Sequence, residues 1–357
     1  MTNSTPPLST SIADIQALIR HQARRVTSYD VATLAGVSQS AVSRCFKPGA
    51  SVSKATYARV MQAAQDLDYI PNAAARSLIT RRSNQVALII SNAAALHFPE
   101  VVSDMSRQFA RRGMRILLFA LPSESEVDQT LAEVWQHQVD GAVVAARLSA
   151  AQVAEFDKRG VPFVLFNRNL RERTVNAIVC DQVEAARLIV SRLAAAGHKR
   201  FAMIDGPHDS VLAQDRSRGV AERLAELHLA PPLVVAGDYD YASGARGMRE
   251  IVSRLGRAPD AIVCGNDIMA IGCLDTARHE MQLDVPGELS ITGFDGVAQA
   301  SWLSYNLTTL RQPMQTMATA ASDMLGALIL DNSASPERRL FSATVVEGGT
   351  ARLGPAF

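Results

Sequence analysis

The chain has 357 residues, a net charge of +1 at pH 7 and an apolar content of 48%, which allow two or three domains with a sizeable core. No run of about 18 apolar residues is present, and the first 25 residues lack the apolar segment and cleavage site of a signal peptide. These features argue against a membrane-spanning or exported protein, and we expect a cytoplasmic one. The cysteines lack C-x-x-C spacing and have apolar neighbours, which predicts reduced, buried thiols at Cys45, Cys180, Cys264 and Cys273 and neither metal nor cofactor.

The small net charge hides an asymmetry between the two ends of the chain. Residues 1–84 contain ten Lys or Arg and four Asp but no Glu, a net charge of +6, which leaves −5 for residues 85–357. A basic head on a mildly acidic body is typical of a phosphate-binding module attached to another domain.

Residues 1–25 are rich in Ser, Thr and Pro and then weakly helical around Ile15, Leu18 and Ile19. We expect a largely disordered N-terminal extension, whose basic end is a candidate for nonspecific phosphate contacts.

Residues 26–70 predict a helix-turn-helix domain. Thr27 and Asp30 have the spacing of a capping box, Gly36 permits the positive φ that ends a first helix, and Ser38 can cap a second helix over residues 39–46. The second helix exposes side chains that suit base edges and phosphates, namely Gln39, Ser40, Ser43 and Arg44. A third helix is predicted to start at residues 52–53. The alternative is a small helical bundle with a solvated polar face.

The next segment, PNAAARSL over residues 71–78, favours the DNA-binding interpretation. It is too short for a stable isolated helix, because helices below about 12 residues are marginal in water. Its alanines allow two such helices to approach closely, and Leu78 is suited to wedge between base steps of a minor groove. We therefore predict a hinge helix and linker over residues 71–84.

The remainder alternates apolar strands with amphipathic helices. Strands are predicted at residues 85–90, 114–119, 141–145, 162–166, 200–204, 232–236, 261–264 and 290–294. Helices are predicted at residues 98–112, 124–138, 149–159, 182–196, 213–227, 241–255, 267–280 and 314–330. Strands that are apolar throughout indicate parallel sheets covered on both faces. Two successive α/β rounds predict two lobes with a ligand crevice at the carboxyl ends of their strands.

The sequence closely resembles the lactose-repressor-type (LacI/GalR) family of bacterial transcriptional regulators. The resemblance is carried by YDVA (29–32), LAGVS (34–38), VSR (42–44), VS (52–53), PNAAARSL (71–78), AAGH (195–198), GND (265–267), MA (269–270), ITGFD (291–295) and LTTLRQP (307–313). It implies a two-lobe periplasmic-binding-protein-like domain over residues 85–357, with three crossovers that we place near Cys180, Arg311 and Asn332. Lobe one would then take residues 85–180 and 312–331, and lobe two residues 181–311 and 333–357, with a last strand of lobe two around residues 341–346.

The resemblance also implies a repressor-type regulator that binds a palindromic operator in double-stranded DNA. The residues expected to contact DNA are Tyr29, Ser38, Gln39, Ser40, Ser43, Arg44, Asn72, Arg76 and Leu78. The sequence reaches Phe357 without a leucine heptad, so we expect a homodimer and not a coiled-coil tetramer.

Polar residues at strand ends and in the loops that follow are the candidates for effector binding. They are Asn92, His97, Phe98, Arg147, Asn167, Arg168, Arg216, Tyr239, Asn266 and Asp295, of which the resemblance favours Asn167, Arg168, Arg216, Asn266 and Asp295. Alternative roles stay open: Asn266, Asp267 and Asp181 as helix caps, Arg168 in a surface ion pair, Phe98 in the core. Gly296 stands where the family usually has a second acid. Arg147, Arg168 and Arg216 together favour a sugar acid over a neutral sugar.

Two other classes of protein fit the sequence less well. A solute-binding protein of a transport system shares the two-lobe plan, but the basic head and the lack of a signal peptide argue against it. An enzyme is disfavoured because no dinucleotide-binding, P-loop, zinc-protease or nucleophile-elbow motif is present.

Overall fold

The computed structural model describes residues 12–47, 49–71, 82–91, 99–121, 126–170, 173–208 and 210–355. The chain divides into two compact units, residues 1–83 and residues 84–357.

The N-terminal unit contains α1 (Ile12–His21), α2 (Ser28–Ala35), α3 (Gln39–Cys45) and α4 (Lys54–Asp66). Val31, Val42 and Val60 are fully buried at its centre. Ile15 of α1 is only 5% exposed and belongs to the same core. The expected disorder of residues 1–25 is therefore wrong for residues 12–21, because this apolar contact gives a weak helical pattern the burial that the segment alone lacks. Residues 1–11 lie outside the described part.

The helix ends follow the capping signals of the sequence. The Thr27 backbone N–H and hydroxyl both donate to the Asp30 carboxylate at 2.8 Å. Gly36 ends α2 with φ 62°, and the Ser38 hydroxyl accepts from the Ala41 N–H at 3.2 Å to begin α3. The Arg24 guanidinium donates two hydrogen bonds of 2.7 and 2.8 Å to the Asp30 carboxylate. Chiefly because of these bonds, the pKa of Asp30 falls to about 2.

Replacing Asp30 should loosen this unit. Asp30→Ala removes the cap and both arginine bonds, and we expect about 1–2 kcal/mol less protection of the helices of residues 28–66. Hydrogen–deuterium exchange of the full chain measures the change as roughly tenfold faster amide exchange there. Because folding lowers the Asp30 pKa, its contribution is present above the unfolded pKa near 4. The difference between wild type and variant should therefore shrink as the pH falls towards about 2.

Asp66→Ala is the matched control, since it removes only one bond from Gln62, at the surface of α4. Equal exchange in Asp30→Ala and Asp66→Ala at neutral pH would show that the Thr27–Asp30 cap does not stabilise the unit.

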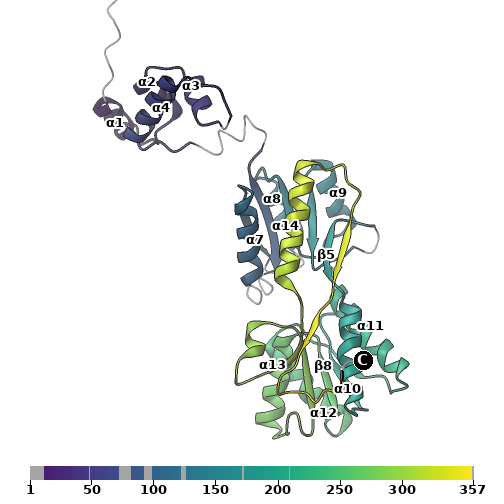
Figure 1. The fold of residues 1–357 in the computed structure, drawn as a ribbon. Coiled ribbons are helices and arrows are strands. Elements are labelled where there is room, and N and C mark those ends of the chain that lie inside the picture. The colour runs from purple at the N-terminus through teal and green to yellow at the C-terminus, as the bar shows by residue number, and fades with distance from the viewer. Residues whose placement is uncertain are drawn as a thin grey trace, which may run out of the picture. The chain divides into compact units, whose positions relative to one another are not determined.

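The C-terminal unit consists of two lobes, each built on a six-stranded sheet covered by helices on both faces (Figure 1). The sheet of lobe one has the order β11-β5-β4-β3-β1-β2 and is parallel throughout. Its strands are β1 (Gln85–Ser91), β2 (Arg115–Leu121), β3 (Gly141–Ala145), β4 (Phe163–Phe166), β5 (Ala177–Cys180) and β11 (Arg338–Phe341). Its helices are α7 (Pro99–Arg111), α8 (Val127–Val134), α9 (Ala150–Arg159) and α14 (Met314–Leu330).

The sheet of lobe two has the order β12-β10-β9-β8-β6-β7, in which only the β10–β12 pair is antiparallel. Its strands are β6 (Phe201–Ile204), β7 (Leu233–Val235), β8 (Ala261–Cys264), β9 (Ser290–Asp295), β10 (Thr308–Arg311) and β12 (Thr344–Val346). Its helices are α10 (Gln182–Ala195), α11 (Val211–Glu226), α12 (Tyr241–Leu255) and α13 (Asp267–Asp275), the last continued by a π-helical turn, Thr276–Glu280.

The apolar strands are buried on both faces, as β1 shows. Val86, Leu88 and Ile90 pack with residues of α7 and α14, and the alternate residues Ala87 and Ile89 pack with α8 and α9. This period of two explains why the sequence of β1 is apolar throughout.

The chain crosses between the lobes three times, and the third crossing differs from the prediction. The first two follow β5 and β10, near Cys180 and Arg311 as expected. The third was expected near Asn332, with one strand of lobe two at residues 341–346. Instead β11 pairs with β5 in lobe one and β12 pairs with β10 in lobe two, so the crossing lies between Phe341 and Thr344 (Figure 1, yellow). β11 is an exposed edge strand, and its sequence, RRLF, lacks the apolar run that made the other strands predictable.

Candidate functional site

The helix-turn-helix presents a polar edge made by the start of α2 and by α3. Tyr29 is 71% exposed, and Ser38, Ser40, Ser43 and Arg44 are also exposed. Gln39 is half-buried, because its Nε2 donates to the Ser28 hydroxyl at 3.2 Å, which ties the first turns of the two helices together. Of the six predicted DNA contacts in the described part of the chain, five are therefore exposed and Gln39 is half-buried. The predicted contacts Asn72, Arg76 and Leu78 lie outside the described residues.

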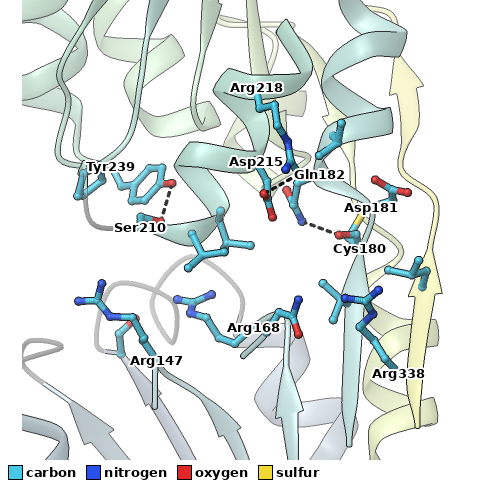
Figure 2. A pocket seen from close by; sticks show the side chains of 18 of the residues that line it. Arg147, Arg168, Cys180, Asp181, Gln182, Ser210, Asp215, Arg218, Tyr239 and Arg338 are labelled. Atoms are coloured by element: carbon cyan, nitrogen blue, oxygen red, sulfur yellow. Dashed lines mark hydrogen bonds and ion pairs between the residues drawn. The ribbon is translucent and has the colours of Figure 1, made fainter. Parts of the chain in front are cut away.

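A cavity of about 630 Å³ opens between the two lobes of the C-terminal unit. Figure 2 shows Arg147, Arg168 and Arg338 on its lobe-one side, facing Ser210, Asp215, Arg218 and Tyr239 of lobe two. A smaller pocket of about 130 Å³ shares Ser91, Arg168, Leu212 and Tyr239 with it and is also lined by Asn167, Arg216, Asn266, Asp295 and Gln312.

The structure brings together every predicted effector residue that it describes. Arg147, Asn167, Arg168, Arg216, Tyr239, Asn266 and Asp295 all line one or both pockets. The other three candidates, Asn92, His97 and Phe98, lie outside the described residues. The fold explains why the seven pocket residues lie together, because the carboxyl ends of parallel strands and the following loops meet at one edge of each sheet.

A buried network joins the lobes at the floor of these pockets. Asn167, at the end of β4, donates from Nδ2 to Gln312 Oε1 at 3.0 Å. Gln312, in the second crossing, donates from Nε2 to Asp295 Oδ1 of lobe two at 2.7 Å. Gln182, just after the first crossing, donates to Asn167 Oδ1 and Gln312 Oε1 at 3.3 Å each. Residues of both lobes and of two crossings therefore satisfy one another away from water.

Arg216 closes this network. It is 3% exposed and donates to Asp295 Oδ1 and Gln182 Oε1 at 2.8 Å each and to the Gly265 carbonyl. Its guanidinium also lies over the Phe294 ring, 3.7 Å from the centroid. The positive charge of Arg216 is therefore met by Asp295 within the protein, which weakens the expectation that this arginine anchors an anionic ligand.

Asp267 has a role that the sequence did not indicate. Asn266 caps α13, accepting from the Met269 N–H at 2.8 Å, whereas fully buried Asp267 accepts from the N–H groups of Gly296 and Val297 at 2.7 and 2.8 Å. The Thr309 hydroxyl donates to its other oxygen at 2.5 Å. Burial raises the pKa of Asp267 to about 8, and the nearby Asp295 adds to the effect. Asp267 thus holds the turn that presents Asp295. The alternative role as a helix cap is therefore confirmed for Asn266 and Asp181 and is wrong for Asp267.

Gln312 and Gln182 were also missed, although Gln312 directly follows β10 and Gln182 lies two residues after the end of β5. Ser210, Asp215, Arg218 and Arg338 are further pocket residues that the sequence analysis did not select. A polar residue within two positions of the end of a crossing strand is the signal that would have found the two glutamines.

Cutting the network should destabilise the C-terminal unit. Gln312→Leu has a similar volume but leaves the buried Asn167 Nδ2 without its acceptor and takes from Asp295 one of its two side-chain donors. We therefore expect about 1–3 kcal/mol less stability in thermal unfolding. Gln315→Leu, on the exposed side of α14, is the control and should stay within about 0.5 kcal/mol of wild type. Equal stability of the two variants would contradict a stabilising role for the network.

Both units of the chain are similar to known protein families. Residues 27–72 match the family described as "Bacterial regulatory proteins, lacI family", and residues 190–351 match a "Periplasmic binding protein-like domain". The transcriptional regulator GalR of Escherichia coli K12 is 33% identical over 325 residues, covering 90% of this chain and 94% of GalR. The lac repressor dimer bound to operator and the anti-inducer ONPF superposes with a TM-score of 0.83 at 26% identity, covering 92% of this chain and 99% of the repressor chain. A complex of the regulator CelR with cellobiose has a TM-score of 0.70 at 28% identity and covers 92% of this chain and 100% of CelR.

A two-lobe ligand-binding fold joined to a helix-turn-helix defines a class of allosteric DNA-binding proteins. The similarity to GalR and to the lacI-family head is decisive: this chain belongs to the LacI family of bacterial regulatory proteins and is a DNA-binding transcriptional regulator. GalR, CelR and the lac repressor are regulators by name, and none of the three is named as an enzyme.

The described part of the chain has no helix long and apolar enough to cross a membrane. Within the same residues, no three or more His, Cys, Asp or Glu side chains gather in a way that could hold a metal ion. All four cysteines are free thiols, buried except for half-buried Cys45.

Proposed function

We propose that this protein represses transcription by binding a palindromic operator as a homodimer, and that a small carbohydrate-type effector in the inter-lobe cavity changes its affinity for that operator. The observation that carries the proposal is the cavity itself. Its lining comes from both lobes, and its floor is a network that includes two of the three crossings. A ligand there contacts both lobes at once and favours the lobe arrangement that fits it.

The relatives support this assignment of partners. The lac repressor structure contains a dimer, an operator and an anti-inducer, and the CelR structure contains cellobiose. A symmetric dimer presents two recognition helices to the two half-sites of a palindrome, and this geometry links a dimer to that kind of operator.

For the DNA-binding edge, we assign base contacts to Gln39, Ser40 and Arg44 at the major groove. We assign contacts to the adjacent DNA phosphate backbone to Tyr29, Ser38 and Ser43. All of these side chains except half-buried Gln39 are exposed, which supports the assignment, since the recognition helix of such a domain enters the groove with its N-terminal residues. Asn72, Arg76 and Leu78 remain assigned to the hinge on the sequence alone.

Removing Arg44 tests the recognition surface. Arg44→Ala should weaken binding to the operator by about 10- to 100-fold, the range expected for a lost arginine–base contact, and should weaken binding to random DNA much less. Fluorescence anisotropy with both DNAs at one stated salt concentration measures the two effects.

Arg257→Ala provides the matched control, because Arg257 is an exposed arginine of lobe two, outside the DNA-binding unit. Equal losses of Arg44→Ala on operator and random DNA would reassign Arg44 to the phosphate backbone, and no loss on either would place it outside the interface.

A further inference from the structure

We infer that the basic end of α1 extends the DNA-binding surface of this protein: Arg20, in the last turn of α1, and Arg25, just after it, bind phosphates of the duplex backbone beside the edge formed by α2 and α3. The lacI-family match begins at residue 27, so this segment lies outside the matched head. The inference rests on the proposed function, because it takes the start of α2 as part of the surface that meets DNA.

The end of α1 is fixed in place near the start of α2. Ile15 of α1 is 5% exposed and packs in the core of the N-terminal unit. After α1, the Arg24 guanidinium donates to the Arg25 carbonyl at 3.2 Å and to both oxygens of Asp30, in the first turn of α2. These bonds hold the backbone of Arg25 close to α2, so its side chain starts from a fixed position.

The start of α2 belongs to the polar edge that we assign to DNA. Tyr29, in the first turn, is 71% exposed, and the Ser28 hydroxyl accepts from Gln39 at the start of α3. Arg25 precedes Tyr29 by four residues, and a chain spans at most about 3.5 Å per residue, so their backbones lie within about 14 Å of each other. A duplex backbone that contacts Tyr29 therefore runs close to Arg25.

The positive charge at this end of α1 is not neutralised by the described part of the protein. Arg20 and Arg25 are both exposed, and neither forms an ion pair with any residue that the structure describes. The Arg20 Nε donates to the Gln16 carbonyl of its own helix, a contact that leaves the charge in place. The next acid along the chain, Asp30, is already paired with Arg24. Both guanidinium groups are thus available to a polyanion.

Duplex DNA is the polyanion that this position favours. A double strand carries one negative charge per about 1.7 Å of helix axis, and a basic segment that continues the DNA-binding edge releases further counterions when it meets those charges. Because the phosphates are alike at every site, contacts from Arg20 and Arg25 add affinity without adding a preference for sequence.

Fluorescence anisotropy of the full-length protein on operator and on random duplex DNA, over a series of salt concentrations, tests the inference. In the double variant Arg20→Gln/Arg25→Gln, we expect both DNAs to bind about three- to tenfold more weakly. The slope of log Kd against log salt concentration should fall by about 1.8, since each lost phosphate contact contributes about 0.9.

Arg59→Gln is the matched control for Arg25→Gln, because Arg59 is an exposed arginine in the middle of α4 and its loss removes the same charge from the same unit. We expect Arg59→Gln to keep the wild-type affinity and slope. Amide exchange of residues 28–66 checks that the head stays folded, since Ile15 and Arg24 are kept in every variant. A wild-type slope in the double variant, or equal losses in Arg25→Gln and Arg59→Gln, would overturn the inference.

The outcomes separate this inference from the proposed function. Operator binding that Arg44→Ala weakens selectively, with wild-type affinity and slope in Arg20→Gln/Arg25→Gln, would overturn the inference and leave the assigned recognition helix intact. Weaker binding of the double variant to both DNAs, with no effect of Arg44→Ala on either, would support the inference and overturn the assignment of the recognition helix.

Discussion

The bond between Arg216 and Asp295 is the constraint around which the C-terminal unit is arranged. Both groups lie in the small pocket at the floor of the cavity, where an unpaired charge would be costly, and each satisfies the other at 2.8 Å. Gln182 accepts a bond from Arg216, Gln312 donates one to Asp295, and both glutamines connect the pair to Asn167 in lobe one. Because the glutamines stand at two crossings, the ion pair is connected to the segments about which the lobes can move.

This arrangement gives a physical account of how a ligand could act at a distance. A molecule whose polar groups compete for Asp295 or Asn167 must replace bonds that now run between the lobes. Its binding energy then depends on how far apart the lobes stand. Asp267 strengthens this dependence, since it accepts two hydrogen bonds from the turn after Asp295 and one from Thr309 of β10, and so restricts how far the Asp295 carboxylate can follow a ligand.

Much of the fold and of the site could be predicted from the sequence, for identifiable reasons. Long apolar strands and amphipathic helices specify parallel sheets, and parallel sheets bring their strand ends together, so Asn167, Asn266 and Asp295 could be grouped without coordinates. What the sequence could not show depended on contacts between distant segments. The edge strand β11 is stabilised by pairing with β5 and lacks an apolar signal of its own. Arg216 was expected to be available to a ligand, and only the structure shows that its charge is already met by Asp295. Similarly, Ile15 belongs to the core only because α2 and α4 supply the other side of it.

The helix α1 has a practical consequence for protein engineering. The match to the lacI-family head begins at residue 27, and a chimeric regulator designed from that boundary would discard both Ile15 and Arg24. The remaining head would have an uncovered apolar site where Ile15 had packed, and an Asp30 carboxylate without its guanidinium. A DNA-binding domain taken from this protein for a chimera should therefore start no later than Ile12, so that it keeps the contacts of Ile15 and Arg24.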